Sequence, residues 1–233
     1  MKISIIGGIL AISTALGSGA TLVEYNFNGG ADGVPDYSPT TTGSGVNVSA
    51  VSPTGTFVRS GSDLTGVTGG GTLAVTFGNI GKESPPVSGA AARTYISFTI
   101  GAASPGQIIS LTSLSFLTNL ATAQASGANY TLQYGSASDP SGFMNLSLSP
   151  NTAQVNSTIV TRTADLSGID FSSFTSGVTF RINVTQPIDS TATGSSSARI
   201  DMINVQGSVI PEPGSAALFV VGTAGVLLGR RRK

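Results

Sequence analysis

The chain has 233 residues, enough for one domain with a substantial hydrophobic core once its two ends are set aside. Only 9% of the residues are charged, against roughly 25% in an average soluble domain. There is no Cys and no His, which excludes thiol chemistry, disulfides and the usual general base near neutral pH. Trp, the side chain that most often stacks on sugar rings, is also missing. We therefore expect a non-enzymatic protein.

The formal net charge of zero conceals an asymmetry along the chain. Residues 21–210 contain ten acidic and six basic side chains, a net charge of −4, and the compensating cations are Lys2 and residues 230–233. A surface that binds nucleic acid needs clustered Lys and Arg to neutralise phosphates. The acidic body therefore argues against nucleic acid as a partner.

The first 20 residues have the three parts of a secretory signal peptide. Lys2 provides the positive start, residues 3–16 are apolar, and Ser18 and Ala20 are small, as the −3 and −1 positions of a cleavage site require. The apolar run is shorter than the roughly 20 residues of a membrane-spanning helix. We predict cleavage after Ala20. The alternative is a buried N-terminal strand or helix.

Residues 21–208 are predicted to form one all-β domain, because short segments of alternating apolar and polar residues are separated by turn residues. The clearest alternation places Val178 and Phe180 on one face, with Thr179 and Arg181 on the other. No segment of this domain shows a sustained helical period. Strands are expected over residues 22–27, 46–51, 73–77, 94–100, 109–117, 130–134, 144–148, 178–184 and 199–209.

Eight or more strands with one apolar face each fit two packed antiparallel sheets. We predict an antiparallel β-sandwich of jelly-roll-like form. The first expected strand, 22–27, should pair with the last, 199–209, which would bring the two ends of the domain together. The Gly and Ser runs are interpreted as loop tips within this one domain.

Two sets of acidic residues are candidate ligands for Ca²⁺, which prefers carboxylate and carbonyl oxygens. Asp32 and Asp36 share a loop, but their spacing differs from the helix-loop-helix calcium motif, and turn formation explains them equally well. By analogy with calcium-bearing sandwiches, where the metal often joins an early acid to a late one, Glu24 and Asp201 are the candidate metal ligands. Calcium is the one cofactor that we consider.

The tyrosines are candidates for stacking on a glycan, because they combine an aromatic ring with a polar group. Tyr130 and Tyr134 share a strand face and could form a platform, although the same spacing is typical of a core face, which we favour. No carboxylate pair stands out as a glycosidase couple. Asp165 and Asp170 are interpreted as turn residues. Arginines within strands are expected at solvent-facing or edge positions.

The C-terminal segment, residues 209–233, combines three features in a fixed order. It begins with Pro211, Glu212 and Pro213, which favour an extended backbone and break a helix. The uncharged apolar run that follows has about 15 residues and would be about 22 Å long as a helix, short of the ~30 Å hydrocarbon core of a membrane. The chain then ends in the basic residues Arg230, Arg231, Arg232 and Lys233. Basic residues after such a run belong on the cytoplasmic side, which orients the body outside the cell.

This segment resembles the PEP-CTERM sorting signal of Gram-negative bacteria. The resemblance implies an exosortase-type processing enzyme as partner and a transient stage in the inner membrane through a hydrophobic C-terminal helix. It also implies cleavage near the Pro-Glu-Pro motif and delivery to the cell surface or extracellular matrix. An ordinary membrane anchor that is never cleaved is the alternative. The body, which opens with residues 25–28 and closes with a strand beginning at 199–201, resembles domains common in PEP-CTERM proteins, which are similar to carbohydrate-binding-module sandwiches.

The sequence therefore predicts an exported, non-enzymatic component of the cell surface or extracellular matrix, sorted by an exosortase-type system. The alternative is a carbohydrate-binding surface module, with extracellular polysaccharide as its partner and a structural Ca²⁺. A surface hydrolase that uses carboxylates is a third reading.

Overall fold

The computed structural model describes residues 19–28, 35–60, 64, 71–76, 79–82, 92–123, 127–136, 142–168, 177–187 and 196–210. These residues form thirteen β-strands and no α-helix, which confirms the predicted all-β class. Within the same ranges, no helix has the length and hydropathy that crossing a membrane requires. Most of the predicted signal peptide and the whole segment 211–233 lie outside the described residues.

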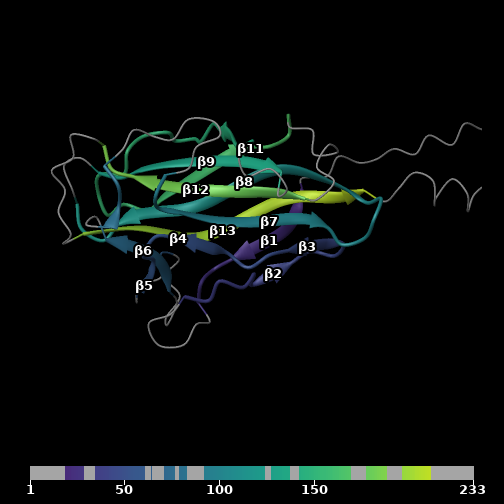
Figure 1. Ribbon diagram of the computed structural model, residues 1–233, viewed down its shortest axis with the longest axis horizontal. Coiled ribbons are helices and arrows are strands. Elements are labelled where there is room, and N and C mark those ends of the chain that lie inside the picture. The colour runs from purple at the N-terminus through teal and green to yellow at the C-terminus, as the bar shows by residue number, and fades with distance from the viewer. Residues whose placement is uncertain are drawn as a thin grey trace, which may run out of the picture.

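The strands form two antiparallel sheets, whose longest strands run along the long axis of the molecule (Figure 1). The seven-stranded sheet consists of β1 (Ala20–Tyr25), β2 (Thr41–Thr42), β5 (Val58–Ser60), β6 (Thr72–Thr76), β8 (Ile108–Leu120), β11 (Val160–Asp165) and β13 (Ser197–Ile210). The six-stranded sheet consists of β3 (Val46–Val48), β4 (Ser52–Thr54), β7 (Tyr95–Ala102), β9 (Asn129–Ser136), β10 (Met144–Leu146) and β12 (Val178–Thr185).

The hydrophobic core lies between the two sheets and is built from the alternating residues of each strand. In the six-stranded sheet, for example, Phe180 of β12 lies opposite Phe98 of β7, and both are buried. Tyr25 of the seven-stranded sheet packs against Phe98 with ring centroids 5.2 Å apart, and its hydroxyl donates a hydrogen bond of 2.6 Å to the carbonyl oxygen of Ser49. Burial of each such side chain contributes about 2 kcal/mol to the stability of the fold. The tyrosine thus joins the two layers by packing and by a hydrogen bond.

The first and last strands of the domain pair with each other, as predicted. β1 runs antiparallel to β13, with Ala20 opposite Gly207. β13 also pairs with β8 along its whole length and ends at Ile210, opposite Ile108. The chain therefore enters and leaves at the same end of the seven-stranded sheet. The closing strand extends two residues beyond the predicted domain boundary at 208.

One of the strands that the sequence did not predict, β11, contains a buried arginine. Arg162 is 1% exposed at an inward-facing position of this edge strand, opposite Phe116 of β8. Its guanidinium donates hydrogen bonds to the carbonyl oxygens of Pro150 and Thr152, at 2.8 and 3.0 Å, and lies over the ring of Tyr130. Burial lowers the pKa of Arg162. Arg162 lies in an edge strand, as expected for strand arginines, but its side chain does not face solvent, because backbone carbonyls accept its hydrogen bonds inside the sandwich.

Candidate functional site

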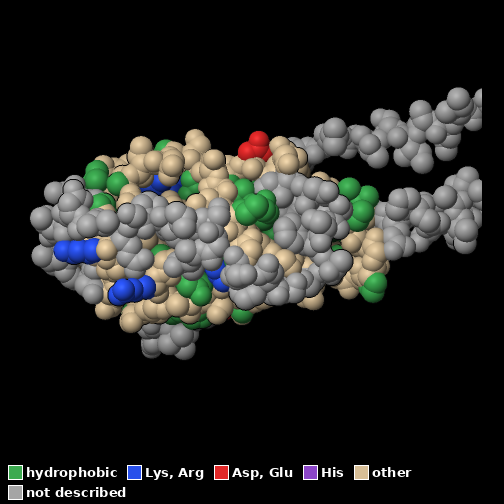
Figure 2. All heavy atoms as spheres, turned by 45° about the horizontal axis from the view of Figure 1, so that its top comes forward, with side chains coloured by type: hydrophobic (Ala, Val, Ile, Leu, Met, Phe, Trp, Pro, Cys, Tyr) green, Lys and Arg blue, Asp and Glu red, His purple; other side chains and the backbone are tan. Residues whose placement is uncertain are grey.

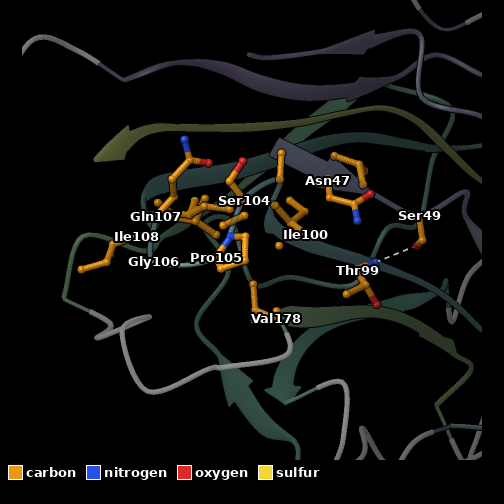
Figure 3. Close-up of a pocket in the computed structure, with 17 residues that line it drawn as sticks. Asn47, Ser49, Thr99, Ile100, Ser104, Pro105, Gly106, Gln107, Ile108 and Val178 are labelled. Atoms are coloured by element: carbon orange, nitrogen blue, oxygen red, sulfur yellow. Dashed lines mark hydrogen bonds between the residues drawn. The ribbon is translucent and has the colours of Figure 1, made fainter. Parts of the chain in front are cut away.

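A cavity of about 760 Å³ opens at one end of the sandwich, where β7 turns into β8 (Figure 3). Both sheets contribute to its walls: β3, β7 and β12 from the six-stranded sheet, and β8 from the seven-stranded sheet. The cavity volume falls within the range of roughly 300–1,000 Å³ that is typical of sites for small molecules. The lining residues are Asn47, Val48, Ser49, Thr99, Ile100, Gly101, Ala102, Ala103, Ser104, Pro105, Gly106, Gln107, Ile108, Ile109, Leu111, Gly177 and Val178.

The cavity lies at the end of the domain from which the chain leaves. Two of its lining residues, Ile108 and Ile109, pair with Ile210 and Val209 at the end of β13. The next residue along the chain is Pro211, the start of the Pro-Glu-Pro motif. Ile210, the last described residue before that motif, therefore pairs with a residue of the cavity lining.

The inner wall of the cavity is aliphatic. Ile100 of β7 and Val178 of β12 are paired neighbours in one sheet, and Leu111 projects from β8 in the other. All three are less than 5% exposed, because they also belong to the core of the sandwich. The wall is therefore rigid and offers an apolar surface to a ligand.

The rim of the cavity is polar and is held in place by hydrogen bonds. The backbone N–H of Thr99 donates to Ser49 Oγ at 2.9 Å, which joins β7 to the segment after β3. Thr99 Oγ1 lies 2.8 Å from Thr179 Oγ1 on the neighbouring strand. Asn47 is exposed at the mouth. Amide and hydroxyl groups thus surround the apolar wall, and they both donate and accept hydrogen bonds.

Gln107 is the polar residue of the cavity whose hydrogen bonding is incomplete. It lies in the turn between β7 and β8, where its backbone N–H donates to the carbonyl oxygen of Ser104 at 3.4 Å. Its side-chain oxygen Oε1 is buried and has no hydrogen-bond donor in the structure as described. A buried acceptor without a donor costs about 1–3 kcal/mol. A hydroxyl or amide group of a bound ligand would remove this cost.

Among the described residues, none that lines the cavity is charged. An ionic ligand would therefore lose its hydration without gaining a partner of opposite charge. A neutral ligand with an apolar face and several hydroxyl groups matches both the aliphatic wall and the polar rim. The described lining residues offer such a ligand both an apolar contact surface and hydrogen-bonding groups, so the cavity is suited to binding it.

The two candidate calcium ligands, Asp201 and Glu24, form hydrogen bonds with different residues. Both oxygens of the buried Asp201 accept backbone N–H groups, Oδ2 from Leu64 at 3.1 Å and Oδ1 from Met202 at 2.8 Å. Glu24 Oε2 lies 3.5 Å from the Asn204 side-chain nitrogen across the β1–β13 pair. No group of three or more acidic residues that could hold a metal occurs within the described ranges. The calcium site stays a prediction.

Most of the tyrosines belong to the interior. Tyr130 is buried, its hydroxyl donates to the carbonyl oxygen of Arg199 at 3.2 Å, and burial raises its pKa. Tyr134 packs against the edge of the core, and its hydroxyl contacts Met144. The core-face reading of this pair is confirmed, and they form no glycan platform. Tyr95 differs, because it lies on the outer face of the six-stranded sheet beneath Arg181.

The acidic side chains of the described turns accept hydrogen bonds from nearby backbone N–H groups. Asp36 Oδ1 accepts the backbone N–H of Ser38 at 2.8 Å, and Asp165 Oδ1 accepts that of Ser167 at 2.9 Å. Hydrogen bonds from Ser167 lower the pKa of Asp165. These contacts confirm the turn interpretation of both residues. Asp32 and Asp170 lie outside the described residues.

The residues of the predicted sorting signal also lie outside the described residues, so these assignments stay predictions: Pro211, Glu212, Pro213, Arg230, Arg231, Arg232 and Lys233. Ala20, the predicted cleavage position, is the first residue of β1 and is exposed. Cleavage after it would leave β1 to begin at Thr21, which still pairs with Gln206. The predicted mature N-terminus is thus compatible with the strand.

The cavity was not predicted from the sequence. A signal for it exists in residues 103–107, where Ala, Ser, Pro, Gly and Gln form a tight turn between two expected strands. That pattern predicts a hairpin, but it does not show that Gln107 lines a cavity or that its Oε1 is buried. Only the packing of β3 and β12 beside the turn creates the hollow.

No protein-family model matches this sequence, and a search of curated proteins finds no relative. Among solved structures, the chain is similar to the CBM22-1 xylan-binding domain of Xyn10C from Paenibacillus barcinonensis. The two share 10% sequence identity with a TM-score of 0.42, over 82% of this chain and 96% of that domain.

Proposed function

We propose that this protein is an exported, non-enzymatic surface or matrix protein whose β-sandwich binds a neutral portion of a polysaccharide in the cavity between β7 and β8. The observation that carries the proposal is the combination of an aliphatic wall, the buried Gln107 Oε1 without a donor and the lack of charge on the lining residues that the structure describes. A sugar residue has an apolar C–H face for Ile100 and Val178, and its hydroxyls can donate to Gln107. The carbohydrate-binding reading is therefore preferred to a purely structural role.

Export and sorting complete the proposal. The signal peptide would bring the chain out of the cytoplasm, and the PEP-CTERM-like tail would be processed by an exosortase-type enzyme. Processing near Pro211 would release the end of the sandwich that holds the cavity, because β13 ends at Ile210 beside the lining residue Ile108. On this proposal, the binding site faces the membrane before processing and the matrix afterwards.

Binding of neutral glycans by the processed protein tests the proposed function. We expect titration calorimetry with neutral oligosaccharides from a glycan panel to detect binding. Gln107→Leu keeps a side chain of similar size but removes the acceptor, so affinity should fall by about tenfold. Gln206→Leu is the matched control, because Gln206 is exposed on β13 and does not line the cavity. Absence of neutral-glycan binding, or equal affinity of the two variants, would contradict the proposal.

A further inference from the structure

We infer that the outer face of the six-stranded sheet carries a second binding site, centred on Arg181, for the carboxylate groups of an acidic polysaccharide. Arg181 lies in β12 between two buried residues of the core face, Phe180 and Ile182. Strand alternation therefore directs its side chain away from the core. It is partly exposed.

Two aromatic rings hold the guanidinium in place. Its central carbon lies 3.5 Å from the ring centroid of Phe143 and 5.3 Å from that of Tyr95. Tyr95 comes from β7, and Phe143 from the residue before β10. A planar guanidinium that stacks on rings keeps its N–H groups at the edge of the plane, free to point at a ligand.

The position of Phe143 depends on a glycine. Gly135 of β9 lies beneath the ring, and a Cβ atom added there would be 3.2 Å from it. Phe143 is 2% exposed, so the ring is packed rather than loosely attached. The missing side chain at Gly135 thus makes room for the ring that supports Arg181. The cation is positioned before any ligand binds, which lowers the entropy cost of binding.

Arg181 has no hydrogen bond and no ion pair in the part of the chain that the structure describes; its contacts there are the two rings. Arg162 shows the contrast, because its donors are used by the carbonyl oxygens of Pro150 and Thr152. A partly exposed guanidinium with available N–H groups is the preferred partner of a carboxylate, which it can bind through two parallel hydrogen bonds.

The neighbours of Arg181 suit a sugar. In the sheet, Arg181 lies between Gln133 of β9 and Ser97 of β7. Gln133 is buried and donates to Asn145 Oδ1 at 3.0 Å, while Asn145 itself is exposed. Ser97 donates to the carbonyl oxygen of Ser52 at 3.3 Å. Amide and hydroxyl groups therefore flank the cation on both sides, where the hydroxyls of a uronic acid would lie.

The charge of the body favours a local contact with one acidic group over an extended ionic interface. Residues 21–210 carry a net charge of −4, so a polyanion is repelled over most of the surface, and nucleic acid would need clustered cations along its phosphate backbone. One clamped arginine can instead bind one carboxylate, and the adjoining hydroxyl and amide groups can bind the rest of that sugar residue. This site is on the outer face of the sheet, whereas the cavity lies between the sheets.

The test uses the processed protein with polygalacturonate as the acidic probe and dextran as a neutral polymer. We expect polygalacturonate to bind, and Arg181→Gln to weaken that binding by about tenfold or more. Arg181→Lys keeps the charge but loses the planar pair of donors, so it should be intermediate. Lys82→Gln is the charge-matched control, because it removes an exposed cation elsewhere and should bind as the unaltered protein does. Phe143→Leu should weaken binding by about threefold, because it removes the ring beneath the guanidinium.

The outcomes separate this inference from the proposed function. Unchanged affinity of Arg181→Gln, or a complete lack of polygalacturonate binding, would overturn the acidic site whatever the cavity does. Tighter binding of heparin than of polygalacturonate, with the same dependence on Arg181, would overturn the choice of carboxylate in favour of sulfate. Loss of neutral-glycan binding in Gln107→Leu alone concerns the cavity. Equal melting temperatures of the variants would show that the fold is intact.

Discussion

Arg162 and Arg181 both occupy the interior of a strand, yet their surroundings give them opposite roles. Arg162 faces the core, where backbone carbonyls and the Thr118 hydroxyl accept its hydrogen bonds. Arg181 faces outward and rests on two rings with its donors available. The direction of the side chain decides between a structural arginine and a binding arginine. The flanking residues differ accordingly: Arg181 lies between the apolar Phe180 and Ile182, whereas Arg162 lies between Thr161 and Thr163.

Replacement of Arg162 should destabilise the fold. Arg162→Met keeps much of the volume but leaves the carbonyl oxygens of Pro150 and Thr152 without donors inside the protein. We expect a loss of about 3 kcal/mol in the free energy of unfolding, measured by urea denaturation. Arg93→Met, at an exposed position, is the control and should change stability by no more than about 0.5 kcal/mol. Equal stabilities would show that the buried hydrogen bonds contribute nothing net.

Buried tyrosines predict a loss of stability in alkaline solution. Burial raises the pKa of Tyr25 and of Tyr130 above the ordinary value of 10.0. Above pH 10.0 the unfolded chain therefore loses these protons while the folded chain keeps them, so the free energy of unfolding falls as pH rises. Below pH 10.0 the full stability of the folded protein is retained. Above pH 10.0 the free energy of unfolding falls by about 1.4 kcal/mol per pH unit for each of the two tyrosines.

Tyr130→Phe provides the check on that pH dependence. Denaturation curves at roughly pH 8 and pH 11 should differ less for this variant than for the unaltered protein, because one of the two titrating groups is gone. An unchanged difference between the two pH values would mean that Tyr130 ionises as easily in the folded protein as in the unfolded one.

At the scale of elements, the strands with an apolar core face were predictable and the others were not. The segment that became β12 alternates cleanly, and its expected span of 178–184 is close to the observed Val178–Thr185. β11 was missed because its inward positions hold Arg162 and Ala164, which give no apolar alternation. β2, β4 and β5 have only two or three residues each, too few to show a period. Their pairing depends on longer neighbouring strands.

Close approach of β13 to its two neighbours makes Gly207 a sensitive position. A Cβ atom there would collide with the carbonyl oxygen of Ser110 and lie 2.9 Å from Leu22 Cδ1. We expect Gly207→Ala to lower the free energy of unfolding by about 2 kcal/mol, because β1 and β8 would both have to shift. Gly168→Ala is the matched control, since nothing lies within 4 Å of its Cβ position. Equal melting temperatures for the two variants would contradict this account.

The whole molecule combines a weakly charged body with two adjoining chain ends. Figure 2 shows only scattered charged side chains among the described residues of the face that it draws. The ends adjoin because β1 and β13 are neighbours in one sheet. The predicted signal peptide and sorting tail would therefore both extend from the end of the sandwich that holds the cavity.

Processing at both ends is the prediction that belongs to this scale. Mass spectrometry of the protein recovered from its native envelope should show a mature N-terminus at Thr21 and a C-terminus between Pro211 and Gly214. Neither cut removes a strand, because β1 still pairs from Thr21 and β13 ends at Ile210. Recovery of intact protein ending in Lys233 would show that the PEP-CTERM interpretation is wrong.

The sequence by itself determined the all-β class, the pairing of the first and last strands and most of the long strands. The class and the strands follow from composition and local periods, and the expected pairing of the ends follows from the closeness of chain termini in compact domains. Only the tertiary structure showed which polar residues are candidates for binding a ligand. Arg181 meets Phe143 and Tyr95, and Gln107 and Val178 line one cavity, only because segments far apart in the chain become neighbours in the fold. Strand alternation indicates which side chains share a face, but it does not specify what lies opposite them.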